Sequence, residues 1–191
     1  FHNDLGIDFK NAGHGLSDES RNRLIEIDKR LIALGIAFSE NIAKDKTELK
    51  FSEVELSGLS KHELNNLKKD EEKFIITMAY PDVNAISENC NVRNTREIVW
   101  KAFNNRAVED NIPILKEAVL LRNEKSKLFG FETWAEYRLQ NRMAKNPKNV
   151  DAMYKDLIPK LQKAAEKEKK DLVIDDIEIN DISPWDIRYF I

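Results

Sequence analysis

The segment from Lys61 to Leu67, KHELNNL, begins with the histidine–glutamate pair of the zinc-protease motif H-E-x-x-H. In that motif, two histidines at positions i and i+4 share one helix face and bind the metal, and the glutamate serves as general base. Asn66 occupies the position of the second histidine. Because an amide is a poor zinc ligand beside imidazole, we expect no zinc site in this segment.

The remaining residues with reactive side chains do not form a recognisable site either. His2 and His14 lie near the start of the chain, so a zinc site would have to collect scattered ligands. Cys90 stands in SENCNV without a catalytic motif around it, and we expect a buried or loop thiol. The sequence has no G-x-S-x-G and no glycine-rich phosphate loop. Asp175 and Asp176 we interpret as surface residues, so the residues nominate no catalytic, cofactor-binding or metal-binding side chain.

A structural role accounts for Glu63 without a metal. Ser60 precedes a short helical pattern, and Glu63 follows three residues later, which is the spacing of a capping box. Leu59 and Leu64 occupy the two positions of a hydrophobic staple. We therefore expect Glu63 to cap a helix and His62 to have no special role.

Apolar residues recur at spacings of three and four in several segments, as is typical of amphipathic helices. The clearest segment runs from Ser17 to about Lys44. We interpret its apolar stripe as core packing, with a partner-binding face as the alternative. The stripe consists of Leu24, Ile27, Leu31, Leu34 and Phe38. Further helices are expected to begin at Ser52, Ser60, Asn94, Pro113 (ending at Gly130), Thr133 (ending near Met143) and Asn146, with a kink at Pro159.

Two segments alternate with a period of two instead, which is typical of strands. They are TELKF at 47–51 and FIITMAY at 74–80, the second ended by Pro81. Six glycines and five prolines are few for a turn-rich sheet protein. The predicted fold class is therefore mainly α: a multi-helix domain with a small two-stranded β ribbon at about 47–51 and 74–80.

Composition narrows the kinds of partner. The 31 basic residues are interspersed among 34 acidic ones, for a net charge of −3, and a basic stripe that would bind nucleic acid is missing. No apolar run approaches the length of a membrane span. A single cysteine favours a reducing compartment. The chain begins FHNDLG and finishes RYFI, which we interpret as the ends of a fragment.

Several stretches, taken in order, resemble the N-terminal half of one family of zinc metallopeptidases, that of thimet oligopeptidase, neurolysin and saccharolysin. The resemblance covers nearly the whole chain and is weakest in the first dozen residues and in 166–182. The stretches are GLSDESRNRLIEIDKRLIALGIAFSENIAKDKTELKFSEVELSGL, AYPDV, NTRE, ILKEAVLLRNEKSKLFGFETWAEYRL, MAKNPKNV and PWDIRYFI. The last is close to a P-W-D-x-R-Y-Y element, with Phe190 in place of the second tyrosine.

The resemblance implies a mostly α-helical, prolate, neurolysin-like molecule with a deep channel between two lobes. Such enzymes hydrolyse short peptides at internal bonds, using zinc held by H-E-x-x-H and a further glutamate downstream. The glutamate of the motif activates the metal-bound water. The resemblance places all of these residues after Ile191, so none of them falls on this sequence.

We therefore expect residues 1–191 to be a single helical region, a fragment of a larger two-lobed peptidase. The fragment would form part of the substrate-channel wall and would be inactive and metal-free by itself, while the parent enzyme would use zinc and act on short peptides. We expect a cytoplasmic location, with a mitochondrial one as the alternative, no nucleic-acid or membrane partner, and self-association through exposed apolar surface. The alternative function is a catalytically empty helical protein-interaction module.

Overall fold

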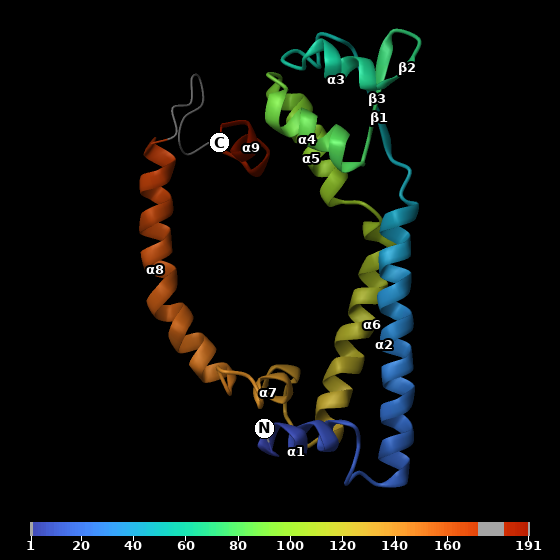
Figure 1. Ribbon diagram of the computed structural model, residues 1–191, viewed down its shortest axis with the longest axis vertical. Helices are drawn as coiled ribbons and strands as arrows, with labels where there is room; N and C mark the ends of the chain where they lie inside the picture. The colour runs from blue at the N-terminus through green and yellow to red at the C-terminus, as the bar shows by residue number, and fades with distance from the viewer. Residues whose placement is uncertain (1, 172–181, 191) are drawn as a thin grey trace. The chain divides into compact units, whose positions relative to one another are not determined.

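The computed structural model describes residues 2–171 and 182–190, and within these it contains nine helices and one three-stranded antiparallel sheet (Figure 1). The mainly α fold class is thus confirmed, while Asp175 and Asp176 lie outside the described residues. The helices are α1 (His2–Asn11), α2 (Asp18–Lys44), α3 (Lys61–Asn66), α4 (Tyr80–Asn89), α5 (Arg93–Asn104), α6 (Val108–Leu128), α7 (Trp134–Leu139), α8 (Pro147–Asp171) and α9 (Pro184–Phe190). The strands are β1 (Glu48–Phe51), β2 (Lys68–Asp70) and β3 (Lys73–Thr77).

The chain divides into two compact units. Unit 1 comprises Phe1–Asn41 and Glu109–Gln162, and so contains α1, α7, most of α2 and α6, and the first part of α8. Unit 2 comprises Ile42–Val108 and Lys163–Ile191, and contains the sheet with α3, α4, α5 and α9. Each unit buries its own set of apolar side chains.

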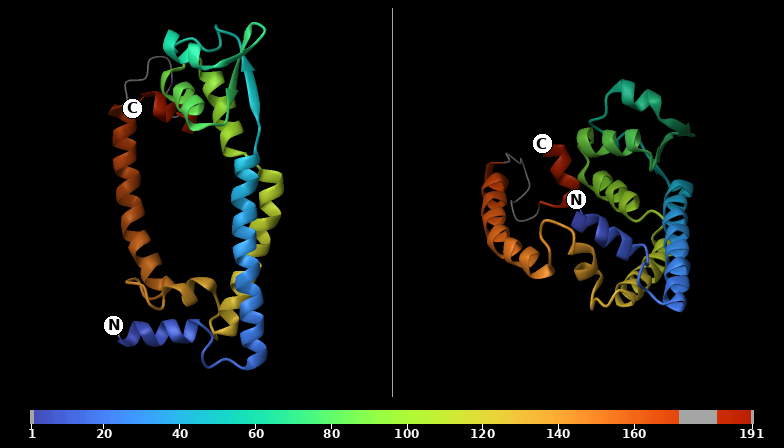
Figure 2. Two further views of the ribbon diagram at one scale, coloured as in Figure 1. Left: turned by 45° about the vertical axis from the view of Figure 1, so that its right-hand side comes forward. Right: turned by 60° about the horizontal axis from the view of Figure 1, so that its bottom comes forward.

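In unit 1, α2 and α6 lie side by side as an antiparallel pair (Figure 2). Leu24, Ile27 and Leu34 of the predicted stripe are buried, which agrees with the core interpretation. The stripe has the alternating three- and four-residue spacing of a coiled-coil seam. The facing positions of α6 keep the same spacing, and they are Asn111, Ile114, Ala118 and Leu121.

Two ion pairs fix the edge of this seam. Arg23 binds Glu124 with two N···O distances of 2.6 and 3.0 Å, and Arg30 binds Glu117 at 2.6 and 2.8 Å. The two arginines are seven residues apart on α2, and the two glutamates are seven residues apart on α6 in the opposite order. Both pairs are therefore satisfied by one antiparallel register of the two helices. All four side chains are partly exposed, so solvent screens both pairs and they contribute to the register more than to stability.

An asparagine pair fixes the register inside the seam. Asn111 is 5% exposed, and its Oδ1 accepts a hydrogen bond of 2.9 Å from Asn41 Nδ2. Its own amide donates to the carbonyl oxygen of Phe38 at 3.1 Å. Sliding either helix would leave these buried polar atoms unpaired, so the pair favours one register at some cost in stability.

The structure corrects the predicted start of α6. The helix begins at Val108 rather than at Pro113, which lies inside it. Glu109 and Asp110 occupy its first turn, where the helix dipole favours acidic side chains. The proline removes a single i→i−4 bond near the N-terminus, so the helix continues through it. The predicted end holds, since the helix stops before Gly130, whose φ is +78°.

The predicted β ribbon is present but differs at its end and in its strand number. β1 pairs antiparallel with β3, with Phe51 opposite Phe74. β3 ends at Thr77, not at residue 80, because Asp82 Oδ2 accepts hydrogen bonds from the Thr77 amide and hydroxyl (2.9 and 2.6 Å). Pro81 then lies in the first turn of α4. β2 joins the other edge of β3, and its exposed residues Lys68–Asp70 lack the apolar alternation that would have predicted it.

The capping predictions hold with two changes. Both bonds of the capping box form at Ser60–Glu63 and at Thr133–Glu136. At Ser52–Glu55 the reciprocal bonds also form, but the chain makes turns there instead of a helix. α7 ends at Leu139 rather than near Met143, and α1, α4 and α9 are helices that the sequence had not predicted.

The core of unit 2 joins the sheet to α4 and α5. Its side chains are apolar and come from the sheet, the turn after β1, and the two helices. Cys90, between α4 and α5, is fully buried in it. The buried members are Phe51, Leu56, Phe74, Ile76, Val83, Ile86, Cys90 and Val99.

Gly58 is required by the packing of this core, which gives a first prediction. Its φ is +103°, and a Cβ would lie 2.2 Å from the carbonyl oxygen of Asn89. We expect Gly58→Ala to lower the free energy of unfolding by about 2–3 kcal/mol, through backbone strain and displacement of that carbonyl. Urea unfolding followed by tryptophan fluorescence measures the loss.

Gly15 supplies the control for this prediction. It has a similar φ of +97°, but a Cβ there would meet no atom within 4 Å. Gly15→Ala should therefore cost only the conformational strain, about 1 kcal/mol. Equal losses for the two variants would show that the close approach to Asn89 is unimportant.

Candidate functional site

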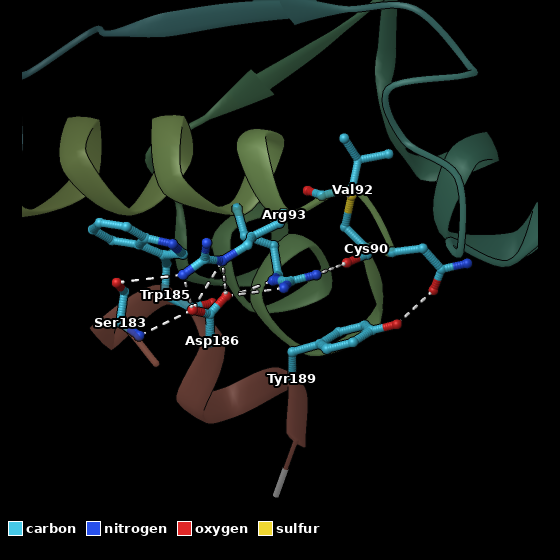
Figure 3. Close-up of polar contacts among 9 residues, drawn as sticks. Cys90, Val92, Arg93, Ser183, Trp185, Asp186 and Tyr189 are labelled. Atoms are coloured by element: carbon cyan, nitrogen blue, oxygen red, sulfur yellow. Dashed lines mark hydrogen bonds and ion pairs between the residues drawn. The ribbon is translucent and has the colours of Figure 1, made fainter. Parts of the chain in front are cut away.

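The described polar cluster with the most buried charge lies where α9 contacts α4 and α5 (Figure 3). Asp186 of α9 is 0% exposed, and its carboxylate lies between two guanidinium groups. Arg93 reaches it through Nε (3.0 and 3.1 Å) and Nη2 (2.8 Å), and Arg96 through Nη2 (3.1 Å). Arg96 is itself 2% exposed, so the cluster contains a buried ion pair.

Local sequence explains how these groups come to face one another. Arg93 and Arg96 are three residues apart on α5 and therefore lie on one helix face. Ser183 and Asp186 form a reciprocal cap at the start of α9: the Ser183 amide donates to Asp186 Oδ2 at 3.0 Å, and the Asp186 amide to the Ser183 carbonyl at 2.9 Å. Pro184 fits the first helical position.

Arg96 connects this ion pair to the surrounding backbone and rings. Its Nη1 donates to the carbonyl oxygen of Cys90 at 2.7 Å, and its Nε to that of Trp185 at 3.3 Å. Its guanidinium lies 4.0 Å from the centre of the Tyr189 ring. Tyr189 in turn donates from its hydroxyl to Asn91 Oδ1 at 2.9 Å (Figure 3). The W-D-x-R-Y residues therefore hold α9 in place.

The cluster keeps Asp186 ionised. Burial raises the pKa of this carboxyl, but hydrogen bonds from Arg93, Ser183 and Arg96 and the charge of Arg93 lower it by more, and the net pKa lies below its ordinary value. Both carboxylate oxygens already accept hydrogen bonds from these groups. An ionised carboxylate with both oxygens engaged is poorly suited to proton transfer or metal binding, so the arrangement serves docking.

A hollow of about 270 Å³ lies beside this cluster, between α4, α5 and α9. Tyr80, Trp100, Phe103 and Trp185 contribute aromatic wall, and Trp100 meets Trp185 edge to face at 5.7 Å between ring centres. Arg188 lines the rim and donates to Asn84 at 2.5 Å. Asn84, Ser87 and Asn104 add polar groups to this lining. Aromatic walls suit an apolar side chain of a ligand, and amide and hydroxyl groups beside them can bind its backbone.

The histidine–glutamate pair lies on α3, and its geometry does not fit a zinc site. Asn66, at the position where the zinc motif has its second histidine, places its side-chain amide nitrogen 3.4 Å from His62 Nε2. Glu63 is occupied on both oxygens, by the Ser60 amide at 2.7 Å and by Asn89 Nδ2 at 2.7 Å. The hydrogen bonds from Ser60 hold the pKa of Glu63 below its ordinary value. These residues serve to cap α3.

The other residues examined for chemistry are separated and structural. The His14 ring lies edge to face against Phe9, with ring centres 5.4 Å apart. Cys90 is buried, 3.4 Å from the carbonyl oxygen of Glu55, and burial raises the pKa of its thiol. Among the residues that the structure describes, no group of three or more His, Cys, Asp or Glu side chains could hold a metal ion. Within the same residues, no helix is both long and apolar enough to span a membrane.

The sequence interpretation missed Arg93, Arg96 and Asp186 as a cluster. One signal was present: Ser183, Pro184 and Asp186 have the order expected of a capped helix start. That signal predicts α9 and a local role for Asp186. It does not identify the arginines, which lie about 90 residues earlier in the chain.

Comparison with known proteins identifies the class to which this arrangement belongs. A model described as "Peptidase family M3" matches residues 86–191, which is more than half of the chain and includes both Arg93 and Asp186. The chain therefore belongs to peptidase family M3.

Particular relatives extend the match towards the N-terminus. The chain is 37% identical to a "Thimet-like oligopeptidase" of Dictyostelium discoideum over 75% of its length, and 31% identical to "Oligopeptidase A" of Salmonella typhimurium over 96%. "Saccharolysin" of Saccharomyces cerevisiae is 27% identical over 96% of the chain. These matches cover 22%, 30% and 28% of the relatives, so the chain spans less than a third of the length of each.

The buried ion pair generates a second prediction. Asp186→Asn removes the charge that compensates Arg96, and we expect the free energy of unfolding to fall by about 3–5 kcal/mol. Asp70→Asn is the matched control in the same unit, because Asp70 pairs with Lys50 where both side chains are about half exposed. The control should lose much less stability than Asp186→Asn, because solvent screens an exposed pair. Urea unfolding measures both, and similar losses would contradict a special role for Asp186.

The lowered pKa of Asp186 generates a third prediction. A carboxyl with a depressed folded pKa stabilises the protein above its unfolded pKa, near 4, and that stabilisation is lost as pH falls through the folded value. The difference in unfolding free energy between the wild type and Asp186→Asn should therefore be constant above about pH 5 and shrink below about pH 4. Glu55 and Glu63, whose pKa values are also lowered, are present in both proteins, so their contributions cancel in this difference. A difference that persists unchanged to the acid limit of folding would contradict the assignment.

Proposed function

We propose that residues 1–191 form a non-catalytic helical portion of a zinc-dependent metalloendopeptidase that hydrolyses short peptides. The observation that carries this proposal is the docking of α9, with its W-D-x-R-Y residues, by Arg93 and Arg96 inside the segment that matches the family model. In this proposal the chain is one helical region of a two-lobed peptidase.

The proposed contribution to catalysis is structural. The hollow between α4, α5 and α9 supports a role in the wall of a substrate channel, because its aromatic side chains suit an apolar side chain of a peptide. Zinc would be held by residues outside this sequence, since the 191 residues contain no H-E-x-x-H. The names of the relatives support short peptides as substrates of the parent enzyme.

The proposed compartment is the cytoplasm, with a mitochondrial location as the alternative. The single, buried cysteine supports a reducing compartment. Relatives named "Mitochondrial intermediate peptidase" are 27% and 29% identical, which keeps the mitochondrial alternative.

A second candidate function is a catalytically empty helical module that acts by binding. The observation that favours it is the exposed apolar surface of α8, whose side chains from Asp151 to Glu168 are all exposed. The same surface supports self-association of the chain. The reading frame after Ile191 discriminates the two functions, because the peptidase proposal requires H-E-x-x-H there and the binding module does not.

The peptidase proposal generates a fourth prediction. Purified residues 1–191 should not hydrolyse a quenched short peptide, with or without added zinc, because the metal-binding motif is missing from the sequence. Release of fluorescence is the measurement, and oligopeptidase A serves as the positive control. Zinc-dependent hydrolysis that follows the chain through purification and is abolished by a chelator would overturn the inactivity.

A further inference from the structure

Two side-chain amides that line the hollow between α4, α5 and α9 each keep one polar group free. Asn84 Oδ1 accepts a hydrogen bond from Arg188, while Asn84 Nδ2 has no partner among the described residues. Asn104 Nδ2 donates to the Trp100 carbonyl oxygen at 2.8 Å, and no donor from the described part of the chain reaches its Oδ1. The hollow therefore presents one free amide donor and one free amide acceptor.

One indole in the wall of the hollow also lacks an acceptor. Trp185 Nε1 is buried, and no described group accepts a hydrogen bond from it. The ring itself is held by Trp100, which it meets edge to face at 5.7 Å between ring centres. Because an unpaired buried donor is costly in free energy, an acceptor supplied by a ligand would stabilise this wall.

The charge at the rim of the hollow is already compensated. Among the described residues that line the hollow, only Arg188 is charged. Its Nη1 binds Asn84 and lies 3.7 Å from Glu88 Oε1. A charged group that entered the hollow would lose its hydration without gaining a free opposite charge, so an uncharged group fits better.

An internal residue of a peptide has the matching chemistry, since its backbone offers one carbonyl acceptor and one N–H donor and has no charge. We propose that the hollow binds such a residue with an aromatic side chain. The side chain lies against the rings of Trp100 and Phe103, and the backbone binds Asn84 and Asn104. A methyl side chain would leave most of the 270 Å³ unfilled. The inference rests on the proposed function for its choice of a peptide, and it adds the site and the preferred residue.

Two blocked amino acids test the site, N-acetyl-phenylalanine N-methylamide and its alanine counterpart, which lacks only the ring. The three indole N–H signals in ¹H–¹⁵N correlation spectra report binding, because Trp100 and Trp185 line the hollow and Trp134 lies in unit 1. We expect the phenylalanine probe to shift the signals of Trp100 and Trp185 but not that of Trp134, with a dissociation constant of about 1 mM. The alanine probe should bind at least about tenfold more weakly.

Asn104 and Asn105 form a matched pair for mutation. Both are exposed at the end of α5, and each donates from Nδ2 to the carbonyl oxygen four residues earlier, at 2.8 and 2.7 Å. Asn104 lines the hollow, whereas Asn105 does not. Asn104→Leu and Asn105→Leu therefore lose the same kind of hydrogen bond, but only the first removes the free acceptor from the site. We expect Asn104→Leu to weaken binding of the phenylalanine probe at least about tenfold and Asn105→Leu to leave it unchanged.

Circular dichroism checks that both variants fold. Signals of Trp100 and Trp185 that do not move, equal affinity for the two probes, or equal losses in the two variants would each overturn the site. These outcomes leave the peptidase assignment standing, because the reading frame after Ile191 tests it separately. Binding as expected in a protein whose reading frame lacks H-E-x-x-H would keep the site and remove the peptidase role.

Discussion

The docking of α9 depends on one buried carboxylate, Asp186, between the guanidinium groups of Arg93 and Arg96. Arg96 is 2% exposed, and an uncompensated charge at that depth would cost several kcal/mol. The same arginine binds the carbonyl oxygens of Cys90 and Trp185 and lies over the ring of Tyr189. The position of α9, the turn between α4 and α5, and the ionisation of Asp186 are therefore parts of one arrangement.

This arrangement extends to the turn that follows β1. The Asn91 amide donates to the carbonyl oxygen of Ser57 at 2.7 Å, and Asn91 Oδ1 accepts from Tyr189. Gly58 allows the two segments to approach this closely. Thr95 adds a hydrogen bond from its hydroxyl to the Glu55 carbonyl at 2.8 Å. Unit 2 thus combines an apolar core with a polar network, whereas the α2–α6 pair of unit 1 relies on a seam, an asparagine pair and exposed ion pairs.

How far the sequence could predict this protein follows from the range of each interaction. α2 and the strands β1 and β3 were predicted because helical periodicity and strand alternation are local properties. The Ser60–Glu63 cap was predicted for the same reason, since its two residues are three positions apart. β2 and the end of β3 were missed because a neighbouring strand and the Asp82 side chain decide them. Asp186 could have paired with any of 31 basic residues, and only the folded chain brings Arg93 and Arg96 to it.

Two short motifs of this chain differ in how far their side chains reach. The histidine–glutamate pair of α3 has the first two residues of a zinc-binding helix, but both carboxylate oxygens of Glu63 accept hydrogen bonds, from Ser60 and Asn89. The pair also lies outside the matched residues 86–191. The W-D-x-R-Y residues match no catalytic motif, but they lie inside the matched segment, and Asp186 among them binds the buried Arg96 of another helix. A motif that a local cap explains completely carries little information about ancestry, because capping boxes recur in unrelated helices. A motif whose residues satisfy distant buried groups constrains two segments at once, because Asp186 and Arg96 must change together if the buried charge is to stay compensated.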